Sequence, residues 1–121
     1  MGTWGKGNFD NDTAADFLSI HTSELISEIE GIIDQPEEIE PDEYEGVALL
    51  CKIEILTILT KQGWVGCVHP NAATIRLWKE KYLFVYDNYR GLEDDVEFNK
   101  ERRKLIQHTF DEYILSINEW A

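Results

Sequence analysis

The spacing of apolar residues predicts the secondary structure of most of this chain. Between residues 13 and 33 apolar residues recur every three or four positions, which is typical of a helix with one buried face. Asp12 or Thr13 is suited to cap the start of this helix, and Asp16 lies where the positive end of the helix dipole stabilises a carboxylate. The residues of the predicted buried face are Ala14, Phe17, Leu18, Leu25, Ile29 and Ile32.

Residues 41–62 are predicted to form a second helix that is apolar on nearly every side. Pro41 suits its first turn, and Gly63 suits its end. Because so few polar residues interrupt it, we expect this helix to be the central and most buried one. Its main stripe consists of Tyr44, Val47, Ala48, Cys51, Ile55, Ile58 and Leu59, which Leu49, Leu50, Ile53 and Leu56 widen.

The remaining segments complete an all-α prediction. Residues 34–41 carry two prolines and four acids and are predicted to be a linker without regular structure. Asn71 can cap a third helix over residues 71–81, while the aromatic run 82–86 is either a short strand or the end of that helix. A fourth helix is expected over residues 94–118, and its predicted inner face is Phe98, Leu105, Ile106, Thr109, Phe110, Tyr113, Ile114 and Ile117.

We therefore predict one domain, residues 1–121, built as a small bundle of about four helices with an aromatic, Gly-rich N-terminal segment. Trp4 and Phe9 in that segment would be costly to leave in water, so we expect it to fold back on the core.

The N-terminal segment also resembles the opening of a bacterial protein family, the domain-of-unknown-function family 4259. Members begin with a W-G-x-G-x-F-D-N-D stretch followed by a helix with small, acidic and large apolar residues. Lys6 departs from the pattern, since a small residue is usual there. The resemblance implies a mostly helical bacterial domain of about this size and no established activity. The matching residues are Trp4, Gly5, Gly7, Phe9, Asp10, Asn11, Asp12, Ala15, Asp16 and Leu18.

Negative charge is concentrated in the first part of the chain. No lysine or arginine occurs between Lys6 and Lys52, and the formal net charge is −13. Such a one-sided field repels nucleic acid and anionic membranes and attracts basic partners. With 43% hydrophobic residues the chain is too apolar for a disordered acidic tail. The acids of residues 7–51 are Asp10, Asp12, Asp16, Glu24, Glu28, Glu30, Asp34, Glu37, Glu38, Glu40, Asp42, Glu43 and Glu45.

Composition also indicates a location. No apolar stretch approaches the length that spans a bilayer, and no basic segment followed by an apolar one marks a secretory signal. Two cysteines are too few for a disulfide framework, so we expect free thiols in a cytoplasmic protein. Cys51 lies in an apolar run and is expected to pack as a small buried hydrophobe.

Metal and cofactor sites are not predicted. Asp10 and Asp12, with Asp16, have the spacing of the first ligands of a calcium loop, but the Gly at the sixth position and the Glu at the twelfth are missing. Helix capping and turn formation explain the same residues. The three histidines, His21, His69 and His108, lie in separate elements without a metal-binding pattern.

An enzyme is the weaker interpretation, and we predict that the protein is not one. Cys67 lies in a loop beside Trp64 and His69 and is a better candidate nucleophile than Cys51. A pocket holding Cys67, His69 and an oriented acid would favour this alternative. The basic cluster of Lys100, Arg102, Arg103 and Lys104 is flanked by acids and is expected to be a solvated helix face rather than a nucleic-acid contact.

The leading hypothesis is a small acidic binding protein, an immunity-type inhibitor that neutralises a basic bacterial toxin, possibly a nuclease. Another alternative is a helical module that self-associates through exposed Trp64, Trp78 or Trp120; the predicted state is a monomer or weak homodimer. Carboxylates would supply the field for the partner, and Ile39 and Tyr44 would supply desolvated anchors. The predicted partner-binding residues are Asp34, Glu37, Glu38, Ile39, Glu40, Asp42, Glu43, Tyr44 and Glu45.

Overall fold

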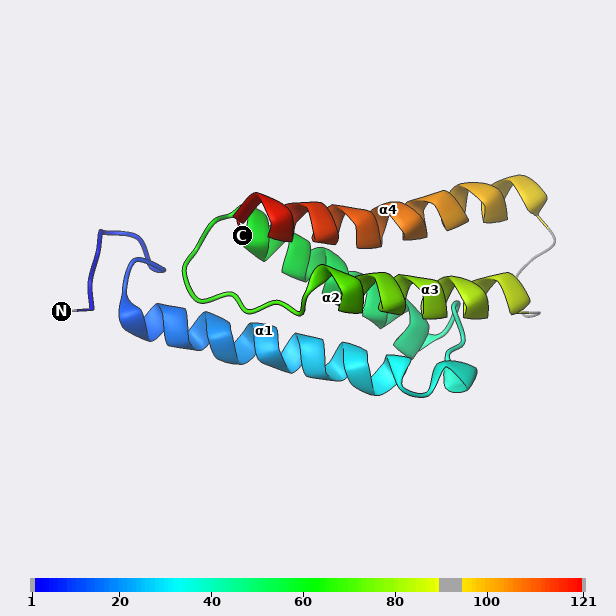
Figure 1. Cartoon of the computed structure of the whole chain (residues 1–121), viewed down its shortest axis with the longest axis horizontal. Helices are drawn as coiled ribbons and strands as arrows, with labels where there is room; N and C mark the ends of the chain where they lie inside the picture. The colour runs from blue at the N-terminus through cyan, green and yellow to red at the C-terminus, as the bar shows by residue number, and fades with distance from the viewer. Residues whose placement is uncertain (1, 90–94, 121) are drawn as a thin grey trace.

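A computed structural model describes residues 2–89 and 95–120 of the chain, and this part is an all-α bundle (Figure 1). The helix α2 packs against both α1 and α4, and α3 packs against α4. An isolated bridge between Thr3 and Asn11 is the β-type pairing in the described residues. The elements are α1 (Asp12–Ile33), the short 3-10 helix η1 (Pro36–Glu38), α2 (Tyr44–Lys61), α3 (Ala72–Asn88) and α4 (Val96–Trp120).

The starts of α1 and α3 are each capped by an asparagine side chain. Asn71 caps α3 as predicted, because its Oδ1 accepts a hydrogen bond of 2.8 Å from the backbone N–H of Thr74. The predicted cap of α1 was one residue or two too late. Asn11, rather than Asp12 or Thr13, accepts the 2.8 Å bond from the N–H of Ala14.

The ambiguous aromatic run 82–86 is helical, as part of α3. Tyr82, Leu83 and Tyr86 are buried at helical spacing. The hydroxyl of Tyr82 donates to the carbonyl of Gly46 over 2.9 Å, and that of Tyr86 donates to the carbonyl of Asn99 over 3.2 Å. A helix places these tyrosines on one side, where they join α3 to the start of α2 and to α4.

The helix α2 has the largest share of buried residues among the described helices, as predicted for the most buried helix, but only one of its faces is buried. Leu49, Leu50, Ile53 and Leu56, which seemed only to widen the stripe, form the buried face. The residues taken as the main stripe include the exposed Tyr44, Val47, Cys51, Ile55 and Ile58. Cys51 is therefore an exposed thiol rather than a buried hydrophobe.

The ends of α2 were predicted with mixed success. Gly63 follows the helix with a φ of 73°, a left-handed conformation that glycine adopts without strain. Pro41 does not belong to the first turn, since Glu43 is the N-cap and Pro41 is a buried residue of the preceding segment.

Three other residues were also wrongly assigned to inner faces. Phe17 of α1, and Phe98 and Leu105 of α4, are exposed. The core instead collects buried side chains from all four helices. Its largest fully buried members are Tyr82, Tyr113, Phe110, Ile29, Ile33, Leu49, Ile53, Leu56, Ile75 and Ile106.

The N-terminal segment folds back through Phe9, whose ring stacks on that of Trp64 with centroids 4.0 Å apart. Trp4 remains half exposed. Asp10 closes the turn, because its Oδ2 accepts a 2.9 Å hydrogen bond from the N–H of Gly7 and its carbonyl accepts a 2.7 Å bond from the N–H of Trp4. These contacts give Asp10 and Asn11 turn-forming and capping roles.

Candidate functional site

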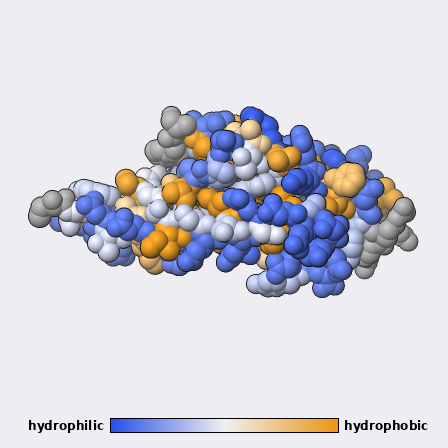
Figure 2. Space-filling view, turned by 60° about the horizontal axis from the view of Figure 1, so that its bottom comes forward, coloured by the Kyte–Doolittle hydropathy of each residue, from blue (hydrophilic) through white to orange (hydrophobic). Residues whose placement is uncertain are grey.

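Seven exposed carboxylates lie at one end of the bundle, where α1 gives way to η1 and α2 begins (Figure 1). The space-filling view shows hydrophilic residues gathered over this end (Figure 2). We call this surface the acidic corner. Its residues are Asp34, Glu37, Glu38, Glu40, Asp42, Glu43 and Glu45.

The segment 34–41, which carries much of the acidic corner, is held in place by buried apolar residues. The residues 34–41 were predicted to lack regular structure, but Pro36–Glu38 form a 3-10 turn in which the N–H of Ile39 donates to the carbonyl of Pro36 over 3.1 Å. Ile39 and Pro41 are both buried. The apolar side chains fix the backbone, and the acids between them point outward.

No carboxylate of the acidic corner forms an ion pair with a basic side chain within the described residues. The bases serve acids elsewhere: Lys52 lies 3.2 Å from Glu28, and Arg103 makes a two-pronged contact with Asp87 at 2.7 and 2.9 Å. The described bases therefore do not neutralise the charge of the corner, and its field can act on a basic partner.

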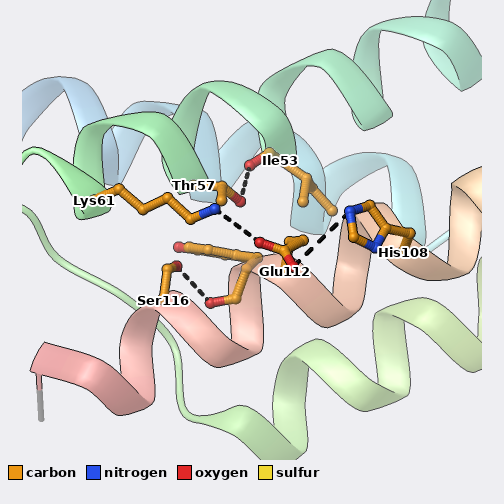
Figure 3. A network of polar contacts seen from close by, with 7 residues as sticks. Ile53, Thr57, Lys61, His108, Glu112 and Ser116 are labelled. Atoms are coloured by element: carbon orange, nitrogen blue, oxygen red, sulfur yellow. Dashed lines mark hydrogen bonds and ion pairs between the residues drawn. The ribbon is translucent and has the colours of Figure 1, made fainter.

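The contrast is clear between α2 and α4, where a base and an acid do meet. Lys61 of α2 reaches Glu112 of α4 over 2.7 Å, and His108 lies 3.9 Å from the same carboxylate (Figure 3). The hydrogen bond from Lys61 lowers the pKa of Glu112. Lys61 and Glu112 thus neutralise each other within the fold, whereas the acidic corner has no such ion pair among the described residues.

Tyr89 connects the acidic corner to the end of α3. Its hydroxyl donates a hydrogen bond to Asp42, and this bond, with the charges of Asp42, Glu40 and Glu43, raises the pKa of Tyr89 to about 12. The phenol therefore stays neutral and remains a donor. The charges of these three carboxylates contribute to the raised pKa after the hydrogen bond and burial.

One predicted anchor of the binding surface is wrong. Ile39 is only 4% exposed and belongs to the core, so a partner cannot reach it. Tyr44 is 77% exposed and stays available. Gly46 faces the carbonyl of Glu40, so this side of α2 lies against the segment 34–41. Tyr44 is two residues from Gly46, about 200° around the helix, and therefore projects onto the outer face of α2.

A hollow of about 400 Å³ lies beside the acidic corner, between η1 and the end of α3. Phe84, 70% exposed, is its most accessible apolar member. The sequence did not single out Phe84, because its role depends on whether residues 82–86 are helix or strand. In a helix it lies two residues from Tyr82 and from Tyr86, and so on the opposite side. The hollow is lined by Pro36, Glu37, Ile39, Phe84, Val85, Asn88 and Tyr89.

The alternative site around Cys67 and His69 is a separate hollow of about 290 Å³, lined by Thr60, Gly63, Trp64, Cys67 and His69. No carboxylate is among these described lining residues. Burial raises the pKa of Cys67 and lowers the pKa of His69, so both neutral forms are favoured. A thiolate nucleophile would need the opposite shifts, and the oriented acid is missing from the described lining.

Two of the tryptophans predicted to support self-association, Trp64 and Trp78, have structural roles instead. Trp78 is 3% exposed, so it cannot support self-association, and Trp64 is stacked on Phe9; the side chain of Trp120 lies outside what the structure describes. Within the described ranges, His, Cys, Asp and Glu side chains nowhere gather in threes that could hold a metal ion. In the same ranges no helix is long and apolar enough to cross a membrane.

The fold and surface define a small all-α protein with a strongly acidic surface whose carboxylates form no ion pair among the described residues. Residues 2–120 match the model of the family described as Domain of unknown function (DUF4259), and the chain belongs to that family. No curated protein and no solved structure matches the chain.

Proposed function

We propose that this protein is a small acidic binding protein of the bacterial cytoplasm, an immunity-type inhibitor that neutralises a basic toxin through the acidic corner. The observation that carries the proposal is that seven exposed carboxylates lie together without an ion pair in the described part of the chain. Elsewhere in the same chain, four lysine and arginine side chains are placed against acids.

A nuclease is the partner that this charge pattern favours. Enzymes that bind nucleic acid carry lysine and arginine to hold phosphates, and an array of carboxylates can occupy the same groove. The long-range attraction would speed association, and added salt would slow it. Tyr44, on the outer face of α2, offers an exposed aromatic ring at the edge of the corner.

The test is capture of a partner from an extract of the source bacterium, followed by measurement of its association rate at low and high salt. We expect a basic protein whose activity falls on binding. Replacing Glu37, Glu38 and Glu40 by glutamine should slow association about tenfold or more at low salt. The matched control replaces three exposed acids outside the corner, Asp16→Asn, Glu54→Gln and Glu80→Gln.

The outcomes separate clearly. Loss of association rate in the corner variant with little change in the control supports the proposal. Capture of no basic protein, an association rate indifferent to salt, or equal losses in both variants would overturn it. Thermal unfolding of both variants shows that the fold is intact, because none of the replaced residues is buried.

A further inference from the structure

The hollow between η1 and the end of α3 has walls of two kinds. One wall is apolar and aromatic, formed by Pro36, Val85 and the exposed ring of Phe84. The other is polar, with the carboxylate of Glu37 and the amide of Asn88. A side chain that is apolar along its length and cationic at its tip fits both walls.

The charge around the hollow determines the sign of its occupant. Glu37 lines it directly. The hydrogen bond to Asp42 and burial raise the pKa of Tyr89, another lining residue, to about 12, and the negative charges of Asp42, Glu40 and Glu43 act in the same direction. No described base forms an ion pair with any of these four acids. The field therefore favours a cation and opposes an anion.

The shape of the polar groups distinguishes arginine from lysine. A planar guanidinium stacks on an aromatic ring and donates to a carboxylate through two N–H groups, whereas an ammonium is a compact and strongly hydrated charge. Asn88 donates its Nδ2 to the carbonyl of Phe84 over 2.7 Å, which orients its Oδ1 as an acceptor. Tyr89, whose hydroxyl interacts with Asp42, places a second ring at the lining of the hollow.

We propose that this hollow binds an arginine side chain of the basic partner, with the guanidinium over Phe84 and against Glu37. The inference rests on the proposed function for the identity of the partner. The arginine site itself is a property of this chain, so it can be tested without the partner.

The first experiment titrates the full chain with N-acetyl-arginine amide and follows the ring resonances of Phe84 and Tyr89 by NMR. N-acetyl-citrulline amide, which keeps the shape and lacks the charge, and N-acetyl-lysine amide, which keeps the charge and lacks the planar fork, are the controls. We expect shifts at Phe84 and Tyr89 with the arginine probe, at least threefold weaker binding of the lysine probe, and no binding of citrulline.

Variants test the two walls separately. Phe84→Leu keeps an apolar side chain and removes the aromatic face, and Glu37→Gln removes the charge. Each should weaken arginine binding several-fold. Phe98→Leu is the matched control, because Phe98 is also an exposed phenylalanine but does not line the hollow. The fold should survive all three, since each side chain is exposed.

Equal binding of the arginine and citrulline probes, or shifts that avoid Phe84 and Tyr89, would overturn the arginine site. If a basic partner is captured but the probe does not bind, the arginine site alone fails. If the probe binds but no basic partner is captured, the inhibitor role fails and the cation-binding hollow stands.

Discussion

The two ends of the bundle drawn in Figure 1 differ in how far their polar side chains are exposed. At the acidic corner the carboxylates are exposed and lack ion pairs among the described residues, while the apolar residues of the same segment are buried. At the other end, Cys67 and His69 of the loop that joins α2 to α3 are half-buried, and Tyr113 of α4 is fully buried. Burial raises the pKa of Cys67 and of Tyr113 and lowers the pKa of His69, which favours the neutral form of each group.

This difference shows which end suits which task. A charged group in water can attract a distant partner, whereas a neutral group in the interior acts only on its contacts. The hydroxyl of Tyr113 and Nδ1 of His69 are buried without a hydrogen-bond partner in the described structure. Such groups would be costly to charge. The corner is therefore the better candidate for recognition, and the other end for holding the loop.

The largest expected effect is at the end that holds the loop. Gly66 has a φ of 112°, and an added Cβ would meet the carbonyl oxygen of Ala15. We expect Gly66→Ala to lower the free energy of unfolding by about 2–4 kcal/mol, from backbone strain and steric overlap together. Urea unfolding measures it. The control is Gly31→Ala in α1, where a Cβ meets nothing and a gain of about 0.5–1 kcal/mol is expected. A Gly66 variant as stable as the native chain would show that this loop is not held rigidly.

A smaller loss is expected at the corner. A Cβ on Gly46 would meet the carbonyl oxygen of Glu40, but no positive φ adds strain there. Gly46→Ala should cost about 1–3 kcal/mol and displace the segment before α2. Displacement would also move Asp42 from Tyr89 and bring the pKa of Tyr89 down from about 12. If stability fell while the pKa of Tyr89 stayed the same, the segment would not have moved as a unit.

The pH dependence of stability should depend on His69 at the loop end. Burial lowers the pKa of His69 from 6.5, so the unfolded chain takes up the proton more readily. Its contribution is fully present above pH 6.5 and is lost as the pH falls through the folded pKa. We expect His69→Gln to reduce the loss of unfolding free energy between pH 6.5 and lower pH, as measured by urea unfolding at a series of pH values. His108→Gln, which replaces an exposed imidazole, is the control. An equal effect of this variant would show that the pH dependence does not come from the burial of His69.

The smallest expected effect on stability is at Asp42. Asp42→Asn removes a charge beside Tyr89 and weakens their hydrogen bond, so the pKa of Tyr89 should fall from about 12 toward 10. Ultraviolet absorbance titration of the tyrosines measures the shift, with Tyr89→Phe identifying which transition belongs to this residue. The melting temperature should change little, because both groups lie at the surface. Replacing Glu24, an acid outside the corner, should leave the transition in place.

Several features could be predicted from the sequence because they depend on neighbours along the chain. Asn71 caps a helix by binding an N–H three residues later, and Gly63 ends one through its own backbone freedom. The helical class follows from apolar spacing, and the family follows from the residues of the N-terminal segment. The grouping of the seven acids also follows, since a short segment with two prolines cannot separate them far.

Only the tertiary structure decided which faces are inside. When apolar residues occur on every side of a helix, their spacing does not indicate which side is buried. In α2 the packing of α1 and α4 decided this, so that Leu49 and Ile53 are in the core and Ile55 and Ile58 are exposed. The same packing buried Ile39. It also brought Pro36 beside Phe84, from elements far apart in the sequence, to form the hollow. Local chemistry thus determined the elements and the charge, whereas contacts between distant segments determined the surface that a partner can meet.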